Sequence, residues 1–383
     1  MLFSSFWMAG FESASHINRH GVRLNMVAAS QHDRFAREDY RRLQTLNISV
    51  VREGVGWPFI ERAGGFDFSS VVAMAAAARD EGMQVNWNLC HYGWPDELDV
   101  FAPQFVERFA RYTRAIARVV AEQSDDVPCY TLINEISFLA WAAGDCGGFI
   151  HPHARSRGDE LKRQLVRAVI AGIEAVRDAD PRARFLHVDP IIRVVHRRDH
   201  PDDAAAAARY TESQHQAWDL LSGRLEPELG GRDEYLDLMG FNFYHSNQWE
   251  YEGERLKWEK HPRDARWTPL HAQLFQMWTR YRRPVVLAET SHIGVGRGAW
   301  IAEIGDEVAK TLDAGVPIEG VCLYPVIDRH DWEDPGHWHN SGVWDLVDDG
   351  HGVYRRVVNQ PYADAIGTAQ DHVATALRRR SRL

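Results

Sequence analysis

The sequence predicts an α/β protein built as a single (β/α)8 TIM barrel, and three observations favour this fold class. Short apolar runs rich in β-branched residues alternate with long amphipathic stretches, which is typical of repeated βα units. The chain has 383 residues, an ordinary length for one such barrel. No linker or low-complexity segment divides it, so residues 1–383 are predicted to form one domain.

Eight of the apolar runs are predicted to be strands. They lie at residues 6–11, 48–52, 84–90, 129–134, 184–189, 238–244, 285–289 and 320–324. The clearest helical pattern covers residues 103–122, where Phe105, Phe109 and Tyr112 recur at spacings of three and four. Further helices are predicted at residues 38–46, 71–81, 159–178, 204–221, 269–281, 300–313 and 362–379.

Eight strands with intervening helices match the number that closes a barrel. The alternative is an open, doubly wound sheet, which needs a glycine-rich phosphate loop after an early strand. The segment from Glu12 to His16 that follows the first predicted strand is ESASH, which contains no such loop. The barrel is therefore the preferred prediction.

Composition and charge exclude several classes of partner. The formal net charge is −10, with Lys and Arg spread along the chain, which argues against nucleic acid. The one basic cluster is interpreted as a helix end; it comprises Arg378, Arg379, Arg380 and Arg382. The N-terminal segment MLFSSFWMAG has no positively charged region, and no run of about 18 apolar residues follows. We therefore expect a soluble, cytoplasmic protein with no membrane partner.

Cysteine and tryptophan usage adds two further expectations. Cys90, Cys129, Cys146 and Cys322 form no CxxC pair, so buried reduced thiols are favoured over disulfides or a zinc site. The chain has 14 Trp residues, several of them beside Gly, Pro, Asp or His in predicted loops. Exposed Trp faces suit the apolar faces of pyranose rings, although a large core also uses Trp.

Polar residues follow most of the predicted strands, at the edge where a barrel of this class carries its active site. They are Arg52, His91, Asn134, Glu135, Asn242, Tyr244, Glu289 and, after the eighth strand, Tyr324 followed by Asp328, Asp331 and Trp332. Such groups are costly to bury unless they are paired or functional. Their shared position at one rim indicates a site there.

Glu135 and Glu289 each come directly after an apolar run, YTLIN and VVLA respectively. Either carboxylate alone is equally explained as the structural partner of an arginine. Two such groups facing one cleft match glycoside hydrolysis, in which one carboxyl group protonates the leaving oxygen and the other meets the anomeric carbon. A separation of about 5–5.5 Å gives retention of configuration, and about 6.5–9.5 Å gives inversion.

The segments that carry these residues resemble, in order along the chain, the motifs of glycoside hydrolase family 1. They are FWMAGFESASH, VVREGVGWPFIE, HYGWPDEL, TLINE, GFNFYHS, VVLAETS and YPVIDRHDW followed by GVWDLVD. The resemblance implies a retaining β-glycosidase that acts on a carbohydrate substrate without a cofactor. It also implies that Glu135 is the acid/base and Glu289 the nucleophile.

Other motif residues are implied to support these two. Arg52 and the phenol of Tyr244 are expected to stabilise ionised Glu289, and Asn134 is implied as a donor to the sugar 2-hydroxyl. Sugar-binding roles are implied for His91, Asn242, Trp332, Asp331 and, where the family has a glutamine, His16 or Glu12. His91 as a loop histidine that caps a helix and Trp332 as a packing residue remain alternatives.

The chain departs from the family pattern at several sugar-recognition positions. Ile136 stands where the family usually has Pro, Thr290 and Ser291 where it has Asn-Gly, and Asp331 where it commonly has Glu. These differences leave the identity of the sugar open more than the type of reaction.

Three alternative functions stay open at this stage: a transglycosylase that uses the same glutamates, a sugar-binding barrel with little catalysis, and a metal-dependent hydrolase. The last would draw its ligands from His330, Asp331, His337, His339, His151 and His153. Because these segments lack the carboxylate-and-helix framework of a hydrolytic metal centre, we interpret the histidines as solvated or sugar-contacting loop residues and predict no metal.

Overall fold

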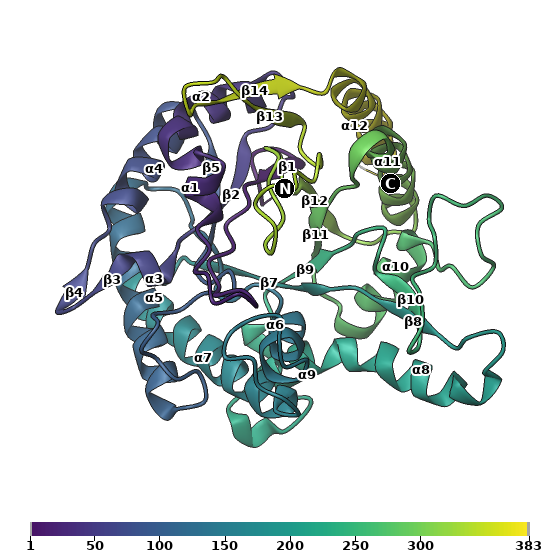
Figure 1. Ribbon diagram of the computed structural model, residues 1–383, viewed down its shortest axis with the longest axis horizontal. Coiled ribbons are helices and arrows are strands. Elements are labelled where there is room, and N and C mark those ends of the chain that lie inside the picture. Colours follow the sequence, from purple (N-terminus) through teal and green to yellow (C-terminus); the bar gives the residue numbers. More distant parts are fainter. Residues whose placement is uncertain (1, 381–383) are drawn as a thin grey trace.

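Eight parallel strands form a closed barrel in the structure, a computed structural model that describes residues 2–380 (Figure 1). Around the barrel they are β1 (Trp7–Gly10), β12 (Ile318–Leu323), β11 (Val285–Thr290), β9 (Leu238–Asn242), β7 (Arg184–Pro190), β6 (Cys129–Thr131), β5 (Gln84–Asn88) and β2 (Val50–Gly54), and β2 pairs with β1 to close the ring. Each predicted strand overlaps one of these eight. The predicted (β/α)8 fold class is confirmed.

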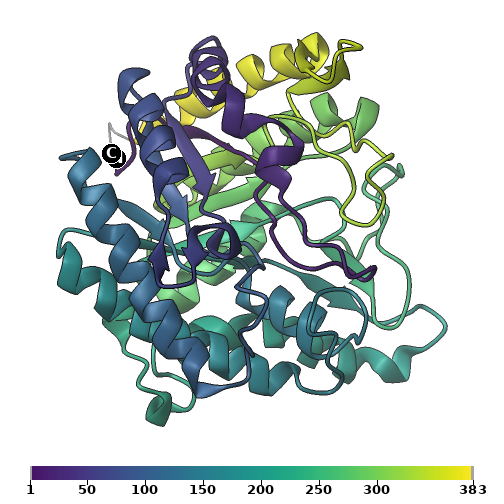
Figure 2. The same cartoon turned by 60° about the vertical axis from the view of Figure 1, so that its left-hand side comes forward.

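Helices cover the outside of the barrel (Figures 1 and 2). They are α1 (Met26–Ala29), α2 (His32–Gln44), α3 (Trp57–Ile60), α4 (Ser69–Asp80), α5 (Pro103–Gln123), α6 (Ile136–Gly144), α7 (Gly158–Ala179), α8 (Ala204–Glu212), α9 (Gln216–Leu221), α10 (Leu270–Tyr281), α11 (Arg297–Asp313) and α12 (Gln360–Arg380). The last turn of α12 contains Arg378, Arg379 and Arg380, as predicted, whereas Arg382 lies outside the described residues.

Several features differ from the predicted elements. The helices α1, α3 and α6 were not predicted. The helix expected at residues 204–221 is divided into α8 and α9 by a 3₁₀ turn at Ser213–His215, which brings the buried side chain of Gln214 within 2.9 Å of the backbone N–H of Ile192. Three short two-stranded sheets were not predicted: β3 (Glu61–Arg62) with β4 (Gly65–Phe66), β8 (Arg193–Val195) with β10 (Gln248–Glu250), and β13 (Trp344–Asp348) with β14 (Tyr354–Val358).

Side chains of the barrel strands alternate between the interior and the helix layer, as the two-residue period of a strand requires. Met8, Val50 and Val286 belong to one small buried cluster, whereas their neighbours Ala9 and Val51 belong to the large cluster shared with the helices. The small cluster fills the barrel with apolar side chains, so polar chemistry is confined to the carboxyl-terminal rim.

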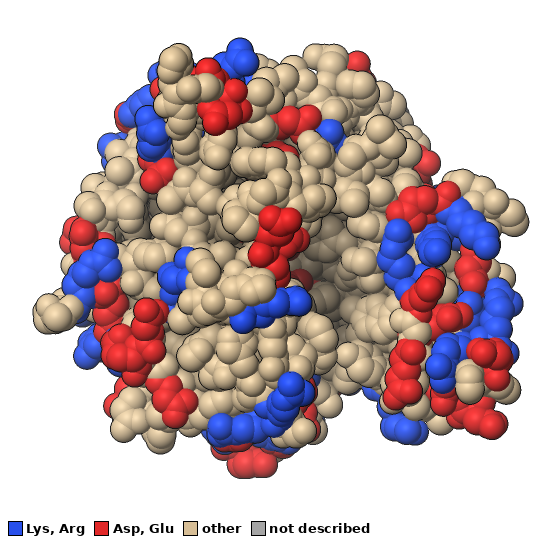
Figure 3. Space-filling view, in the orientation of Figure 1, with Lys and Arg blue, Asp and Glu red and all other residues tan. Residues whose placement is uncertain are grey.

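Charged side chains of both signs are mixed on the surface shown in Figure 3. There, Lys and Arg lie among Asp and Glu around a central hollow. Within residues 2–380, none of the helices combines the length and apolar character needed to cross a membrane. All four cysteines are free thiols, and Cys90, Cys129 and Cys322 are buried.

Candidate active site

A register shift in β11 directs Glu289 to the rim of the barrel. Leu287 pairs with Phe241 of β9, but the next paired residue is Glu289, which aligns with Asn242, so Ala288 is an extra residue. Regular alternation would place residue 289 on the same side as Leu287, which packs in the helix layer. The irregularity therefore turns the carboxylate toward the mouth of the barrel, a common use of bulges beside active sites.

Glu289 is held by a cation and a phenol. Arg52, in the middle of β2, donates from Nη1 to Oε1 of Glu289, and the Tyr244 hydroxyl donates to Oε2 at 2.7 Å. Burial raises the pKa of Glu289 above its usual value, and the charge and hydrogen bond of Arg52 and the hydrogen bond of Tyr244 oppose that rise. Both groups favour the ionised carboxylate, as expected from the sequence.

Glu135 reaches the same cavity from a different backbone conformation. It lies just before α6 in the left-handed region, with φ 48° and ψ 64°, and its backbone N–H donates to the carbonyl of Val188 at 3.0 Å. Non-glycine residues rarely adopt this conformation, and the strain it carries is typical of functional positions.

The partners of Glu135 are neutral. Asn242 donates from Nδ2 to Oε1 at 2.8 Å, and the Tyr92 hydroxyl donates to Oε2. Burial raises the pKa of Glu135 most strongly, and the nearby Glu289 raises it further, whereas the two hydrogen bonds lower it. Because Glu289 faces the guanidinium, the geometry places the negative charge of the pair on Glu289 and the proton on Glu135.

A continuous chain of hydrogen bonds joins the two glutamates. Arg52 also donates from Nη2 to Oδ1 of Asn134 at 2.5 Å, and Asn134 in turn donates from Nδ2 to the Tyr92 hydroxyl at 2.9 Å. All of these side chains are buried or nearly so. The amide of Asn134, predicted to contact the sugar, thus links the partners of the two glutamates.

A cavity of about 270 Å³ adjoins both glutamates. Glu12, Tyr324 and Arg329 line its inner part, and Glu12 forms an ion pair with Arg329 at 3.1 Å while accepting hydrogen bonds from the backbone N–H groups of Ser13 and Ala14. Trp332 also lines the cavity. A pyranose ring bound in this cavity would therefore contact the Glu12–Arg329 ion pair and the ring of Trp332.

His91 lines this cavity and is predominantly neutral, because burial holds its pKa well below the usual value. Its Nδ1 lies 2.8 Å from Asn88 Nδ2 and 3.0 Å from Ser13 Oγ, and its Nε2 lies 3.3 Å from Asn134. This network fixes the imidazole, since each ring nitrogen has a partner.

Two other predicted sugar-binding residues lie behind the cavity wall. Both carboxylate oxygens of Asp331 are engaged, one by His339 at 3.0 Å and one by the backbone N–H groups of Glu333 and Asp334. His16 is buried with its ring edge-on to Trp332 at 4.9 Å, and burial lowers its pKa to about 3. Asp331 thus organises the loop after β12, and His16 supports Trp332.

Tyr92 and Arg329 were not singled out in the sequence. Tyr92 immediately follows His91 in HYGWPDEL, and its φ of 67° turns its side chain toward Glu135. No sequence signal separates it from an ordinary loop tyrosine. Arg329 lies two residues before Asp331, and only the folded loop pairs it with Glu12.

One group of residues away from Glu135 and Glu289 has converging metal-ligand atoms within residues 2–380: His245, Glu259 and His292. The two imidazole rings lie 4.1 Å apart at a tilt of 38°, and Arg255 binds both oxygens of Glu259, at 2.9 and 3.0 Å. Ring contact and an ion pair therefore account for this group. The histidines at 330, 337 and 339, proposed above as alternative ligands, do not form such a group among the described residues.

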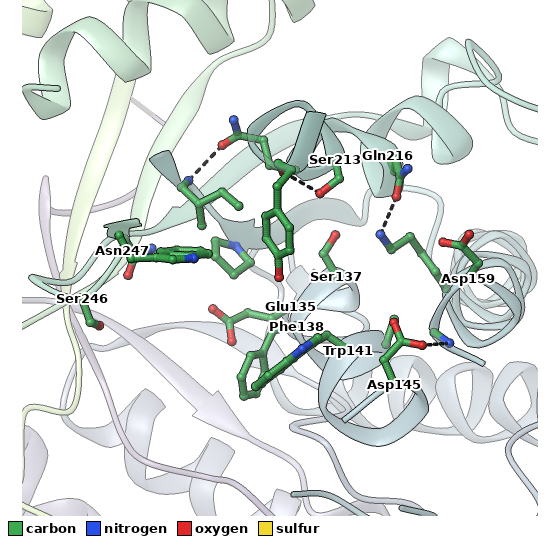
Figure 4. Close-up of a pocket in the computed structure, with 18 of the residues that line it drawn as sticks. Glu135, Ser137, Phe138, Trp141, Asp145, Asp159, Ser213, Gln216, Ser246 and Asn247 are labelled. Atoms are coloured by element: carbon green, nitrogen blue, oxygen red, sulfur yellow. Dashed lines mark hydrogen bonds between the residues drawn. The ribbon is translucent and has the colours of Figure 1, made fainter. Parts of the chain in front are cut away.

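A second and larger cavity, of about 710 Å³, also adjoins Glu135. Figure 4 shows residues that line it. The larger cavity shares Glu135, Phe138, Tyr244 and Ser246 with the smaller one. Phe138 and Trp141 come from α6, the helix that follows Glu135 directly. The site thus consists of two unequal compartments that meet at Glu135, and Glu289 lines only the smaller one.

Comparison with solved structures shows the same architecture in known enzymes. A β-glucosidase from Thermotoga maritima in complex with castanospermine has a TM-score of 0.73 at 15% identity, covering 96% of this chain and 97% of that chain. The fold is that of a family 1 β-glucosidase. A structure described by that name, also from T. maritima and in complex with isofagomine lactam, has a TM-score of 0.69 at 14% identity, covering 90% and 88% of the two chains.

A further similar structure is the virulence factor SghA from Agrobacterium tumefaciens, with a TM-score of 0.70 at 17% identity, covering 89% of this chain and 87% of that chain. No protein-family model and no curated protein sequence matches the chain. At these identities the likeness establishes the fold, and the chemistry rests on the side chains described above.

Proposed function

We propose that the protein is a retaining β-glycosidase, with one catalytic domain over residues 1–383 and no cofactor. The observation that carries this proposal is the pair of buried glutamates at one cavity, one bound by Arg52 and the other by neutral donors only. Such opposed environments supply the ionised nucleophile and the protonated acid that double displacement requires.

In the first step, a carboxylate oxygen of Glu289 bonds to the anomeric carbon as the bond to the leaving oxygen breaks. Glu135 transfers its proton to that oxygen, which leaves as an alcohol. The negative charge then resides on Glu135, whose pKa falls because the charge of Glu289, which had raised it, is gone.

In the second step, Glu135 takes a proton from water as the water oxygen bonds to the anomeric carbon. The bond to Glu289 breaks, and both side chains return to their starting states. Arg52 and the Tyr244 hydroxyl position and stabilise Glu289 as it leaves, since both contact its oxygens. The smaller cavity holds the sugar, with His91, Glu12, Arg329 and Trp332 as its walls.

β-Glucosides are the first substrates to test, because similar structures are described as β-glucosidases. Proton NMR during hydrolysis of an aryl β-glucoside distinguishes the two stereochemical courses. We expect the β-anomer of glucose to appear first and to mutarotate later. Initial release of the α-anomer would show inversion and contradict the proposed role of Glu289 as a nucleophile.

A further inference from the structure

The larger cavity lies where the leaving group must go. Glu135 protonates the leaving oxygen in the proposed reaction, so the group attached to that oxygen extends past Glu135 and away from the sugar. The cavity of about 710 Å³ adjoins Glu135 on that side and is far larger than the 270 Å³ compartment assigned to the sugar. Its lining therefore reports the chemistry of the leaving group.

Two pairs of aromatic rings line the larger cavity. Phe138 and Trp141 of α6 lie 5.9 Å apart (Figure 4), and Tyr210 of α8 meets Trp249 of β10 at 5.9 Å in an edge-to-face arrangement. These elements are additions to the barrel, placed beyond the carboxyl ends of β6, β7 and β9. The rings are thus contributed by the segments that surround the site, independently of the barrel core.

Trp141 and Tyr210 are unusually open for large side chains, with 45% and 39% of their surface exposed. In residues 2–380, Trp141 is the one tryptophan among the exposed large hydrophobic residues. Exposed aromatic surface beside a cavity marks a place where a ligand removes it from water.

Several polar side chains that line the same cavity are hydrogen-bonded within the protein. The Gln214 amide oxygen accepts from Ile192 N at 2.9 Å, and Asp145 Oδ1 accepts from Gly158 N at 2.6 Å. Lys162 donates to Gln216 Oε1 at 2.7 Å (Figure 4). Each of these contacts uses part of the hydrogen-bonding capacity of a group that lines the cavity.

The same holds close to the catalytic pair. Asn247 donates from Nδ2 to the carbonyl oxygens of Ile191 and Asn242, at 2.8 and 3.0 Å, and Ser137 donates from Oγ to Asp189 at 2.7 Å. A second sugar ring presents many hydroxyl groups that need partners of their own. An aromatic group needs only other rings that it can pack against by their faces or edges.

We propose that the larger cavity binds a bulky aromatic, non-sugar leaving group, so that the substrates of this protein are β-glycosides of aryl or arylalkyl alcohols and not oligosaccharides. The inference rests on the proposed glycosidase function and narrows its substrate class. The aromatic walls stack on the aglycone while the smaller cavity fixes the sugar.

The test compares three β-D-glucosides by the rate of glucose release: 2-(2-naphthyl)ethyl glucoside, ethyl glucoside and cellobiose. The first two share a primary-alcohol leaving group, so their intrinsic reactivities are close and the difference reports binding of the naphthyl group. We expect kcat/KM for the naphthylethyl glucoside to exceed both of the others by at least about tenfold, corresponding to about 1.4 kcal/mol.

Variants assign this preference to the cavity. Trp141→Ala is expected to lower the ratio of kcat/KM for naphthylethyl glucoside over ethyl glucoside by about tenfold, and Tyr210→Ala, on the opposite wall, to lower it in the same direction. Phe275→Ala, which removes an aromatic ring of α10 that is 42% exposed and does not line the cavity, is the matched control and leaves the ratio unchanged. Circular dichroism melts confirm that each variant is folded.

The possible failures are distinct. If cellobiose matches or exceeds the naphthylethyl glucoside, or if neither wall variant changes the ratio, the inference is overturned while the glycosidase function stands. If none of the three glucosides and no aryl glycoside of another sugar is hydrolysed, the proposed function fails and the inference fails with it.

Discussion

Glu135 and Glu289 are the same type of residue in the same cavity, and their surroundings differ in three respects. Glu289 extends from a strand with a register shift, meets a guanidinium and accepts from a phenol. Glu135 precedes a helix, has a left-handed backbone and meets only an amide and a phenol. Burial raises the pKa of both carboxyl groups, so the proposed difference in their protonation rests on the partner side chains.

The largest effect is expected from removing the proposed nucleophile. Glu289→Gln keeps the shape but eliminates the attacking oxygen anion, so kcat should fall by about 10⁶-fold, as when other enzymes lose their nucleophile. Glu160→Gln is the control. Glu160 lies on α7, forms an exposed ion pair with Arg157 and lines neither cavity. Steady-state hydrolysis of an aryl β-glucoside measures both, and a variant with more than a hundredth of the wild-type kcat would contradict the assignment.

Loss of the acid is expected to have a smaller and substrate-dependent effect. Glu135→Gln removes the transferable proton, and general acid catalysis contributes about 10²–10⁴-fold. A substrate with an acidic phenol as leaving group needs little protonation, so its first step is slowed less than that of an alkyl glycoside. Added azide, which attacks the glycosyl-enzyme without a general base, should restore turnover of the phenolic substrate. Equal losses on both substrates, with no effect of azide, would argue against Glu135 as acid/base.

The contribution of Tyr244 can be isolated from that of Arg52. Tyr244→Phe deletes one hydrogen bond to a charged oxygen, worth about 1.5–3 kcal/mol, so kcat/KM should fall by about 10- to 150-fold. Tyr354→Phe on β14, outside the cavity, provides the comparison. An unchanged kcat/KM for the Tyr244 variant would mean that the phenol does not act on the transition state.

The most subtle prediction concerns pH. The Tyr92 hydroxyl donates to Glu135 and lowers the pKa of that carboxyl group. In Tyr92→Phe the ionised form loses this stabilisation, so the pKa of Glu135 rises and the acid stays protonated to higher pH. The basic limb of the profile of kcat/KM against pH should therefore move to higher pH. A basic limb that moves to lower pH would mean that Tyr92 raises the pKa of Glu135, and it would contradict the proposed hydrogen bond from Tyr92.

Much of this arrangement was predictable from the sequence, because strand periodicity and the residues after each strand depend on short segments. All eight strands and the position of both glutamates at the rim follow from such local patterns. The partners of Glu135 do not, since Tyr92 and Asn242 lie 43 and 107 residues away along the chain. The same limitation hid the Glu12–Arg329 pair, whose members are brought together from opposite ends of the barrel sequence.

The larger cavity could not be predicted from local sequence patterns either. The run ISFLAWAAG predicts apolar character for α6, yet it does not indicate that Phe138 and Trp141 face a cavity instead of the core. Their exposure depends on α8 and β10, which come from later in the chain. The proposed recognition of the aglycone thus depends on packed segments, whereas the proposed reaction type rests on motifs.

The division of roles between the two glutamates is tested most directly by incubating the protein with a 2-deoxy-2-fluoro β-glycosyl fluoride and analysing the peptides by mass spectrometry. The fluorine slows both steps, and the fluoride leaving group lets the first proceed, so a covalent glycosyl-enzyme accumulates. We expect one label per protein chain, located on Glu289. A label on Glu135, or hydrolysis of glycosides by a protein that never accumulates a covalent adduct, would contradict the account.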